Sequence, residues 1–564
     1  MHLRSAHNAR QGLLRLPTEV LTSILEAIPD LASARWHEFQ PSWRSIATDG
    51  SMLIPMTHTC RRLREIALAH HSLWATLTTK KPQLVPNFVE RSRPAPLTVA
   101  AWSLQNIPAI LDVFFTGEAN RIQELHLFSI EIEHMSYLFE LLKCPLPALK
   151  SLTLTCYLVA SRWGDKPSEL PLSRERNPSL QYLALKDVPF LPETGFPTLT
   201  HLSLTYVTVP SLYSRVIDFV SDCPRLESVA LSGLWSEADT LDVGAYKTPL
   251  PLSHLRRVTL HELYNQSLQL FSFLLHPTKS DSAYHILNYD PRDQASLMDF
   301  LLEPVRMHKH LAGLPAEDPQ LCISLHPDRN GDFSTWECAP AITVTTREQT
   351  RRLGACSGQR RVTGSSLTWI SSLLSANAAA LTSIREVWLV NATPSTFLPR
   401  PPSPAPCNAI DSPLVHLPAL ETLILVIDHT FLCATAWSGL YLLPSSQDPT
   451  FVVPNITTLR LIHGYSDYAL TQQRAAANCM ELPDTLDFTA TLQELSTGAY
   501  GYLRNTHLVV QTVGCMRVDA GDLESLRKYF KTVQRQRLEA LPAMPVRGED
   551  PASRGCERWP GALW

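Results

Sequence analysis

The hexapeptide LQYLAL, residues 180–185, decides the fold of this chain. Alternate residues of a β-strand point to opposite faces of a sheet. Leu183 and Leu185 are therefore expected to enter a core while Tyr182 and Ala184 face outward, and Leu180 turns inward just before the strand. The pattern L-x-x-L-x-L thus predicts a strand with one buried face.

The same pattern occurs nine times, so the strand is one of a series. Successive final leucines in the first six copies are 27, 31, 19, 27 and 29 residues apart. This spacing is close to the roughly 20–29-residue period of leucine-rich repeats. The copies are IQELHL (122–127), LKSLTL (149–154), LQYLAL (180–185), LTHLSL (199–204), LESVAL (226–231), LRRVTL (255–260), IREVWL (384–389), LETLIL (420–425) and ITTLRL (456–461).

Helical segments separate the strands, as at residues 211–224 and 267–277, where apolar residues recur at three-to-four spacing. A proline ends each of these helices, because proline cannot continue a helix. One strand-and-helix unit cannot bury its apolar edge alone, but stacked units share a continuous core. We therefore predict an α/β fold in which residues 97–541 form a curved, leucine-rich-repeat-like solenoid with a parallel sheet.

This region resembles the irregular leucine-rich-repeat regions found behind F-boxes. It departs from the usual repeat where a buried asparagine is expected three places after the last leucine. Apolar residues stand there instead, so the side-chain hydrogen-bond ladder is missing and we expect a less regular solenoid. The alternative is an ordinary α/β domain with similar strands. The replacing residues are Val188, Val207, Leu234, Leu263 and Ala392.

The N-terminal stretch, residues 13–80, predicts a small helical domain. It begins LLRLPTEVLTSILEAIPD, with Pro17 just inside the helix start, where its missing N–H costs nothing. A second helix follows in MTHTCRRLREIALAHH, with Cys60, Leu63 and Ile66 on its apolar side, and Trp74 is a large apolar anchor. So many aliphatic side chains on so small a unit indicate a docking surface. Those that share one face of the first helix are Leu16, Val20, Leu21, Ile24 and Leu25.

The same stretch resembles the F-box, in the F-box-like form common in fungal proteins. The matching residues are L-P-T-E-V-L-T-S-I-L at 16–25, T-H-T-C-R-R-L-R-E-I-A at 57–67 and S-L-W at 72–74. Leu63 stands where the family usually carries tryptophan, and the segment 29–53 is longer than a minimal F-box linker. The alternative is an ordinary helical cap on a larger domain.

The resemblance implies that the chain binds a Skp1-like adaptor and enters a cullin-based ubiquitin ligase of the SCF type. The chain would then be a non-catalytic substrate receptor, whose contribution is to hold a target close to the transfer machinery. The adaptor-binding residues that the resemblance implies are Leu16, Pro17, Val20, Leu21, Ile24, Leu25 and Trp74.

Composition excludes several classes of partner. The 564 residues carry a formal net charge of −4, and a polyanion would need a concentrated positive face, so we expect no nucleic-acid partner. No apolar run approaches the roughly 18 residues that cross a bilayer, so we expect no membrane. The 12 cysteines include no C-x-x-C pair, and the N-terminus has no signal-peptide core. These features predict reduced cysteines and a cytoplasmic or nuclear protein.

Catalytic and metal-binding motifs are absent from the sequence. It contains no G-x-S-x-G, no Walker loop, no G-x-G-x-x-G and no H-E-x-x-H, so we predict no catalytic residue and no cofactor. Residues 328–332, DRNGD, have a calcium-loop composition, but no glutamate closes the loop at its twelfth position. We therefore predict no metal site.

The remaining segments are less regular. An insertion at about 280–365 breaks the repeat, with strands at 283–289 and 321–327 and a hairpin at Asn330-Gly331. We predict further elements as a helix at 365–384, a proline-rich loop at 399–413, a strand at 507–513, an amphipathic helix at 522–541 that caps the sheet, and a disordered tail at 542–564.

The outward strand positions form the expected target-binding face. They are small, hydroxyl-rich and nearly neutral in the first six copies, and larger and more apolar in the last three. Tryptophan and arginine are enriched at binding hot spots, which favours Trp388 and Arg460. Alternatively, the insertion or the C-terminal helix covers these residues. The candidate target-binding residues are Phe128, Tyr182, His261, Trp388 and Arg460.

Three functions follow from these patterns. The first is the SCF-type substrate receptor, which binds a Skp1-like adaptor, a cullin complex and an unknown target protein. The second is a leucine-rich-repeat scaffold that binds proteins without any ligase connection. The third is an enzyme, which would need a pocket of converging ionisable groups that the sequence does not reveal.

Overall fold

The computed structural model describes two compact units, one within Met1–Lys279 and one within Ser280–Gly548. The described residues are 12–33, 53–78, 82–102, 117–131, 134–156, 169–170, 172–234, 248–261, 263, 265–275, 277, 282–289, 320–327, 338–345, 349–355, 374–375, 381–390, 414, 417–428, 455–464, 485–486, 488–498, 500–513 and 517–538.

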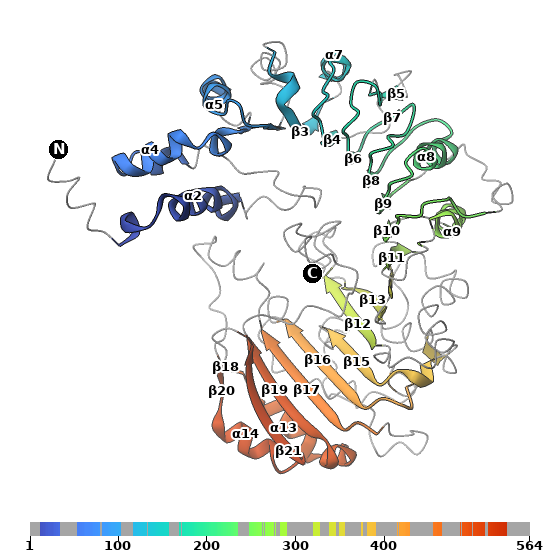
Figure 1. Cartoon of the computed structure of the whole chain (residues 1–564). Helices are drawn as coiled ribbons and strands as arrows, with labels where there is room; N and C mark the ends of the chain where they lie inside the picture. Colours follow the sequence, from blue (N-terminus) through green and yellow to red (C-terminus); the bar gives the residue numbers. More distant parts are fainter. Residues whose placement is uncertain are drawn as a thin grey trace. The chain divides into compact units, whose positions relative to one another are not determined.

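The first unit begins with short helices and continues as a parallel sheet (Figure 1). Its helices are η1 (Leu13–Arg15), α2 (Thr18–Ser33), α3 (Leu53–Thr57), α4 (Arg61–Ala69), η4 (His71–Trp74), η5 (Pro82–Leu84), α5 (Val85–Arg91), η7 (Glu118–Arg121), α7 (Met135–Lys143), α8 (Leu212–Ser221) and α9 (Asn265–Leu274). Its main strands are β1 (Thr76–Thr78), β2 (Leu97–Trp102), β3 (Ile122–Ile130), β4 (Ser151–Cys156), β6 (Tyr182–Lys186), β8 (His201–Thr205), β9 (Ser228–Ser232) and β10 (Arg257–His261).

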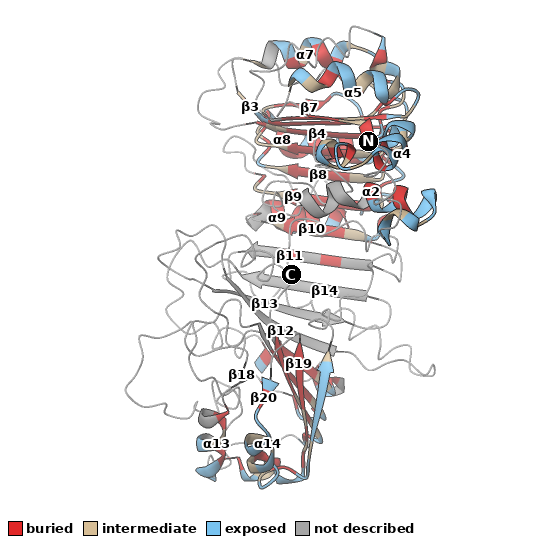
Figure 2. Cartoon of the chain, turned by 90° about the vertical axis from the view of Figure 1, so that its left-hand side faces the viewer, coloured by how far each residue is buried: buried red, intermediate tan, exposed pale blue. Residues whose placement is uncertain are grey.

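These eight strands pair in chain order, each parallel to the next. The short strands β5 (Glu169–Leu170) and β7 (Leu191–Pro192) form a separate parallel pair. The helices α7, α8 and α9 lie on one side of the main sheet (Figure 1). The strands of this sheet carry many buried residues (Figure 2). The L-x-L leucines are among them, and Leu183 and Leu185 of β6 are 0% and 1% exposed. Burial of each such side chain contributes about 1.5–3 kcal/mol.

The predicted strands and the two inter-strand helices of this unit are confirmed. All six hexapeptides between residues 122 and 260 lie in strands, and α8 and α9 occupy the predicted helical segments. Four of the apolar residues that replace the repeat asparagine, Val188, Val207, Leu234 and Leu263, are buried at 1% exposure or less. They add to the core in place of a polar ladder.

The second unit combines a parallel series with an antiparallel insertion. β12 (Gln320–Pro327), β13 (Cys338–Thr345) and β14 (Gln349–Ala355) pair antiparallel in succession, and β11 (Ser282–Tyr289) runs parallel to β14. β12 also pairs with the parallel series β15 (Glu386–Val390), β16 (Thr422–Asp428), β17 (Thr458–Gly464), β19 (His507–Val513) and β21 (Thr532–Leu538). The smaller elements are η12 (Leu381–Ser383), β18 (Thr485–Leu486), α13 (Thr489–Ser496), η18 (Gly501–Asn505), β20 (Arg517–Val518) and α14 (Ala520–Leu526).

The last three hexapeptides lie in β15, β16 and β17, and the predicted strands at 283–289, 321–327 and 507–513 are confirmed. β12 and β13 pair antiparallel as the predicted hairpin requires, although its Asn330-Gly331 turn lies outside the described residues. The proline-rich loop, the DRNGD segment, most of the 365–384 helix, the tail and Ala392 also lie outside them.

The predicted helix at 522–541 is wrong. The helix α14 ends at Leu526, and residues 532–538 form β21, parallel to β19. The Lys531 amide donates to the Thr506 carbonyl at 3.1 Å and begins this pairing. The open edge of β19 offers backbone partners, so sheet pairing outweighs the helical spacing of Leu523, Leu526 and Phe530.

Candidate functional site

The N-terminal helices hold one another through buried leucines and backbone contacts. Leu21 and Leu25 of α2 are each 1% exposed, and Leu63 of α4 is buried with them in the chain's interior. The Arg62 guanidinium of α4 donates through Nη2 to the Leu16 carbonyl at 2.9 Å. The thiol of Cys60 caps α4 by accepting from the Leu63 amide, so this cysteine precedes the helix rather than lying in its apolar face.

The surface of this helical group retains large apolar side chains. Val20 and Ile24 are one turn apart on α2 and are 42% and 37% exposed. Leu13 of η1 and Leu68 of α4 are also exposed. Of the predicted adaptor-binding residues, the structure therefore places Val20, Ile24 and Pro17 at the surface and Leu16 partly so, whereas Leu21, Leu25 and Trp74 are internal.

Trp74 ties the helices to the start of the sheet. It is fully buried, and its indole Nε1 donates to the Ala67 carbonyl of α4 at 2.7 Å. Its ring meets Phe88 of α5 edge to face, with centroids 5.2 Å apart, and the Arg91 guanidinium lies 4.8 Å from its centroid. One side chain thus bridges α4 and α5.

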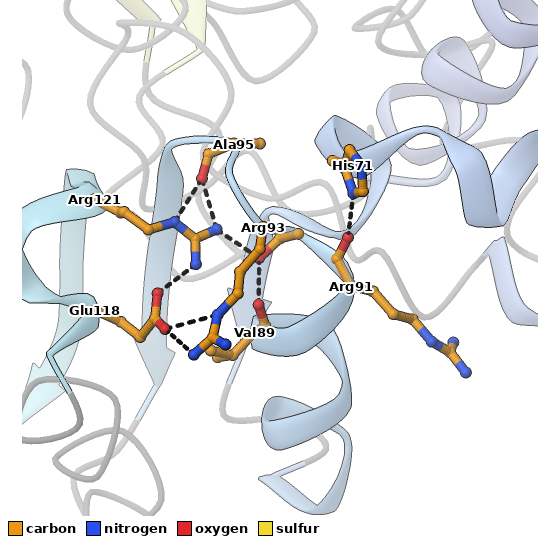
Figure 3. Close-up of polar contacts among 8 residues, drawn as sticks. His71, Val89, Arg91, Arg93, Ala95, Glu118 and Arg121 are labelled. Atoms are coloured by element: carbon orange, nitrogen blue, oxygen red, sulfur yellow. Dashed lines mark hydrogen bonds and ion pairs between the residues drawn. The ribbon is translucent and has the colours of Figure 1, made fainter.

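A buried carboxylate, Glu118, connects the end of α5 to the start of β3, and we call this connection the joint (Figure 3). Glu118 is 6% exposed and forms ion pairs with Arg93 and Arg121. Arg121 also donates to the Ser92 hydroxyl at 2.9 Å and, through Nη2, to the Ala95 carbonyl at 2.7 Å. Burial alone raises the pKa of Glu118, but the bonds and charges of Arg121 and Arg93 outweigh it and hold the net pKa below its ordinary value. The Glu118 carboxylate is therefore ionised at physiological pH and paired with both arginines.

The outward face of the first sheet is polar and closely packed at its β3–β4 end. His126 of β3 is fully buried, with its Nδ1 3.0 Å from the Thr153 hydroxyl and its Nε2 3.3 Å from a Glu124 carboxylate oxygen. Phe128, a candidate target-binding residue, stacks on His126 and is 3% exposed. Phe128 is therefore almost inaccessible to a binding partner in this conformation.

Half-buried polar side chains cover the β6–β10 end. Tyr182 and His201 are neighbours, with ring centroids 4.6 Å apart, and the His261 Nδ1 lies 2.9 Å from the Ser232 hydroxyl. Burial and, to a smaller degree, the positive charge of Arg257 lower the pKa of His201 to about 3. Its imidazole is therefore neutral at physiological pH. Tyr182 and His261 are thus placed on one face, as predicted from strand alternation.

The remaining two candidates lie on the second unit. Trp388 is 8% exposed and forms an apolar cluster with Ile424, Val426 and Ile462, against which Leu538 packs. Its indole Nε1 donates to a Glu386 carboxylate at 2.7 Å. Arg460 donates to Gln511, which in turn donates to Gln536. These side-chain hydrogen bonds connect β17, β19 and β21. Trp388 is thus already packed within the folded chain.

The described part of the chain contains no metal-binding cluster and no membrane-spanning helix. There, no three His, Cys, Asp or Glu side chains are grouped to hold a metal ion, and no helix has the length and apolar character to cross a bilayer. Burial raises the pKa of both Cys156 and Cys223 to about 12, so these two remain thiols at physiological pH.

Sequence reasoning missed two groups of residues. The exposure of Leu13 and Leu68 was not predicted, because both lie within the helical domain at 13–80 but outside the segments that match the F-box. The Arg93–Glu118–Arg121 group joins residues 25 positions apart, and no short motif signals it. The chain matches no known protein-family model, and no curated protein matches it.

Proposed function

We propose that the chain is the substrate receptor of an SCF-type ubiquitin ligase. In this proposal, the α2–α4 group binds a Skp1-like adaptor within a cullin complex. The outward strand faces hold a target protein, and other subunits transfer ubiquitin. The chain itself makes and breaks no bond and acts in the cytoplasm or nucleus.

The observation that carries the proposal is the exposed apolar surface of the helical group. Val20 and Ile24 remain exposed although Leu21, Leu25 and Trp74 already fill the interior. Exposed aliphatic side chains concentrated on one small element mark protein-binding surfaces. The residues at 16–25, 57–67 and 72–74 that resemble the F-box lie in and around α2 and α4, and this supports the Skp1-like adaptor as the partner.

The parallel strands in chain order support a leucine-rich-repeat-like solenoid as the target-binding part. Successive parallel pairing of β2, β3, β4, β6, β8, β9 and β10, with helices on one side, leaves the other side of the sheet for a partner. Most described outward side chains of β6, β8, β9 and β10 are polar. A protein target read by shape and hydrogen bonds fits such a face.

The double variant Val20→Asp, Ile24→Asp tests adaptor binding. We expect capture of a recombinant Skp1-like adaptor by the full chain to weaken roughly 30-fold, about 2 kcal/mol, because two charged groups would be desolvated at the interface. Titration by surface plasmon resonance measures it. Both residues are exposed, so the fold should survive, unlike with aspartate at buried Leu21 or Leu25.

Phe273→Asp is the matched control, since Phe273 is a 41% exposed apolar residue on α9. It should leave adaptor binding unchanged. If the wild-type chain fails to bind the adaptor at micromolar concentration, the ligase connection is rejected and the protein-binding scaffold becomes the better function.

A further inference from the structure

The outward positions of β6, β8, β9 and β10 align in three rows. The first row contains Tyr182, His201, Ser228 and Arg257, the second Ala184, Ser203, Ala230 and Thr259, and the third Lys186, Thr205, Ser232 and His261. None of these twelve residues is acidic. The middle row is uniformly small, and Ala184, Ala230 and Thr259 within it are buried at 6%, 4% and 3% exposure. A partner would therefore contact the longer side chains of the outer rows, such as Tyr182, Arg257 and Lys186.

A buried hydroxyl in the first row lacks a hydrogen-bond partner. Ser228 is 0% exposed, and its Oγ is unpaired. Ser228 stands in register between His201 on one neighbouring strand and Arg257 on the other, and the backbones of neighbouring strands are roughly 4.8 Å apart. An unsatisfied buried hydroxyl is costly and calls for an explanation. An acceptor supplied by a bound partner would satisfy it.

Arg257 stands directly beside Ser228 in the strand register and supplies the one cationic side chain of this row. It is half-buried, and among the described residues it forms no ion pair with a carboxylate. His201 is neutral at physiological pH, and the charge of Lys186 is partly offset by Asp187, which follows it in the chain. The face therefore offers one concentrated positive group next to an unused donor.

We propose that this face binds an extended acidic segment of a target protein, with an aspartate or glutamate carboxylate received by Arg257 and the Ser228 hydroxyl. The Arg257 side chain turns to admit the carboxylate, as interface side chains commonly do on binding. Carboxylates and arginine form strong charge-assisted bonds. One arginine is too few for a nucleic-acid backbone, whose binding requires several phosphate contacts.

The inference rests on the proposed function of the strand face as a target-binding surface. Its test does not involve the adaptor, so the two can fail separately. If the face binds acidic peptides but the chain does not bind the adaptor, only the ligase connection is rejected. If the chain binds the adaptor but the face shows no preference for acidic peptides, only the present inference is rejected.

The experiment selects phage-displayed random dodecapeptides on the immobilised full chain. We expect peptides enriched in Asp and Glu, and a synthetic copy of the best peptide should bind Arg257→Glu about tenfold more weakly or worse. Repeating the selection on Arg257→Glu should enrich Lys and Arg instead. Arg225→Glu, the same charge change at an exposed turn residue before β9, should leave the acidic enrichment unchanged.

Two further variants separate binding from folding. Arg257→Gln retains most of the side-chain volume and should also lose the acidic enrichment. Ser228→Ala should weaken the acidic peptide about threefold while leaving urea unfolding of the free chain unchanged or more stable, because an unpaired hydroxyl is removed. Selection without acidic enrichment, equal affinity of wild type and Arg257→Glu, or equally tight binding of a single-stranded oligonucleotide overturns the proposal.

Discussion

Replacing Trp74 by alanine should destabilise the first unit by about 4 kcal/mol, within the range for large-to-small substitution of a buried aromatic residue. The indole is fully buried, and it contacts both α4 and α5 through the Ala67 carbonyl and the Phe88 ring. Its removal leaves a cavity where the helices join the sheet. Urea unfolding measures the loss of unfolding free energy, and hydrogen exchange of the α4 and β2 amides shows where the loss lies.

Trp74→Phe separates the packing role from a direct adaptor contact. Phenylalanine keeps an aromatic ring against Phe88 but loses the Nε1 hydrogen bond, and we expect a cost of about 1–2 kcal/mol. Because Trp74 is internal, the adaptor binding that we propose for the wild type should be retained in the folded Trp74→Phe protein. A folded Trp74→Phe chain that loses the adaptor would show that the indole itself reaches the partner.

The strands could be predicted because their signal is local. In L-x-x-L-x-L, each leucine's face follows from the two-residue period of a strand, without knowledge of distant residues. The outward positions of Tyr182 and Lys186 therefore followed directly, and both are half-buried whereas Leu183 and Leu185 are fully buried. The α/β class and the buried Val188 and Val207 follow from the same local pattern.

The strand β21 could not be predicted because its cause is distant. Residues 532–538 pair with β19, whose edge supplies seven successive partners from His507 to Val513. A helical spacing of Leu523, Leu526 and Phe530 competes with this pairing and loses after Leu526. Local periodicity contains no information about whether an open strand edge lies nearby.

The candidate site shows the same limit at the level of single residues. Val20, Leu21, Ile24 and Leu25 belong to one broad apolar stripe of α2, so spacing identifies the face. The division of that stripe into buried Leu21 and Leu25 and exposed Val20 and Ile24 depends on how α2 packs against α3 and α4. The unpaired Ser228 hydroxyl likewise depends on neighbours about 27 residues away on other strands.

Glu118→Gln should destabilise the first unit by about 3 kcal/mol at pH 7. The substitution places a neutral amide at the buried position of Glu118 and removes the negative charge that pairs with Arg93 and Arg121. Arg121 is the more enclosed partner, at 18% side-chain exposure against 63% for Arg93, so it suffers most. The effect is local to the joint between α5 and β3 and is measured by urea unfolding and by exchange of the β3 amides.

The pH dependence of this variant follows from the lowered pKa of Glu118. A carboxylate whose folded pKa lies below its ordinary value of 4.5 stabilises the fold fully above that value. The contribution is lost as pH falls through the folded pKa. The difference in unfolding free energy between wild type and Glu118→Gln should therefore be constant from pH 7 to about 5.5 and shrink below pH 4.5.

Glu140→Gln is the matched control, because Glu140 pairs with Lys143 on α7 with both side chains more than half exposed. Surface pairs contribute only about 0–1 kcal/mol, so this variant should shift stability little and show no comparable change with pH. If Glu118→Gln behaves like Glu140→Gln, the Arg93–Glu118–Arg121 group does not hold the joint. A large, acid-sensitive loss at Glu118 alone shows that a buried charge fixes the helices to the first strands.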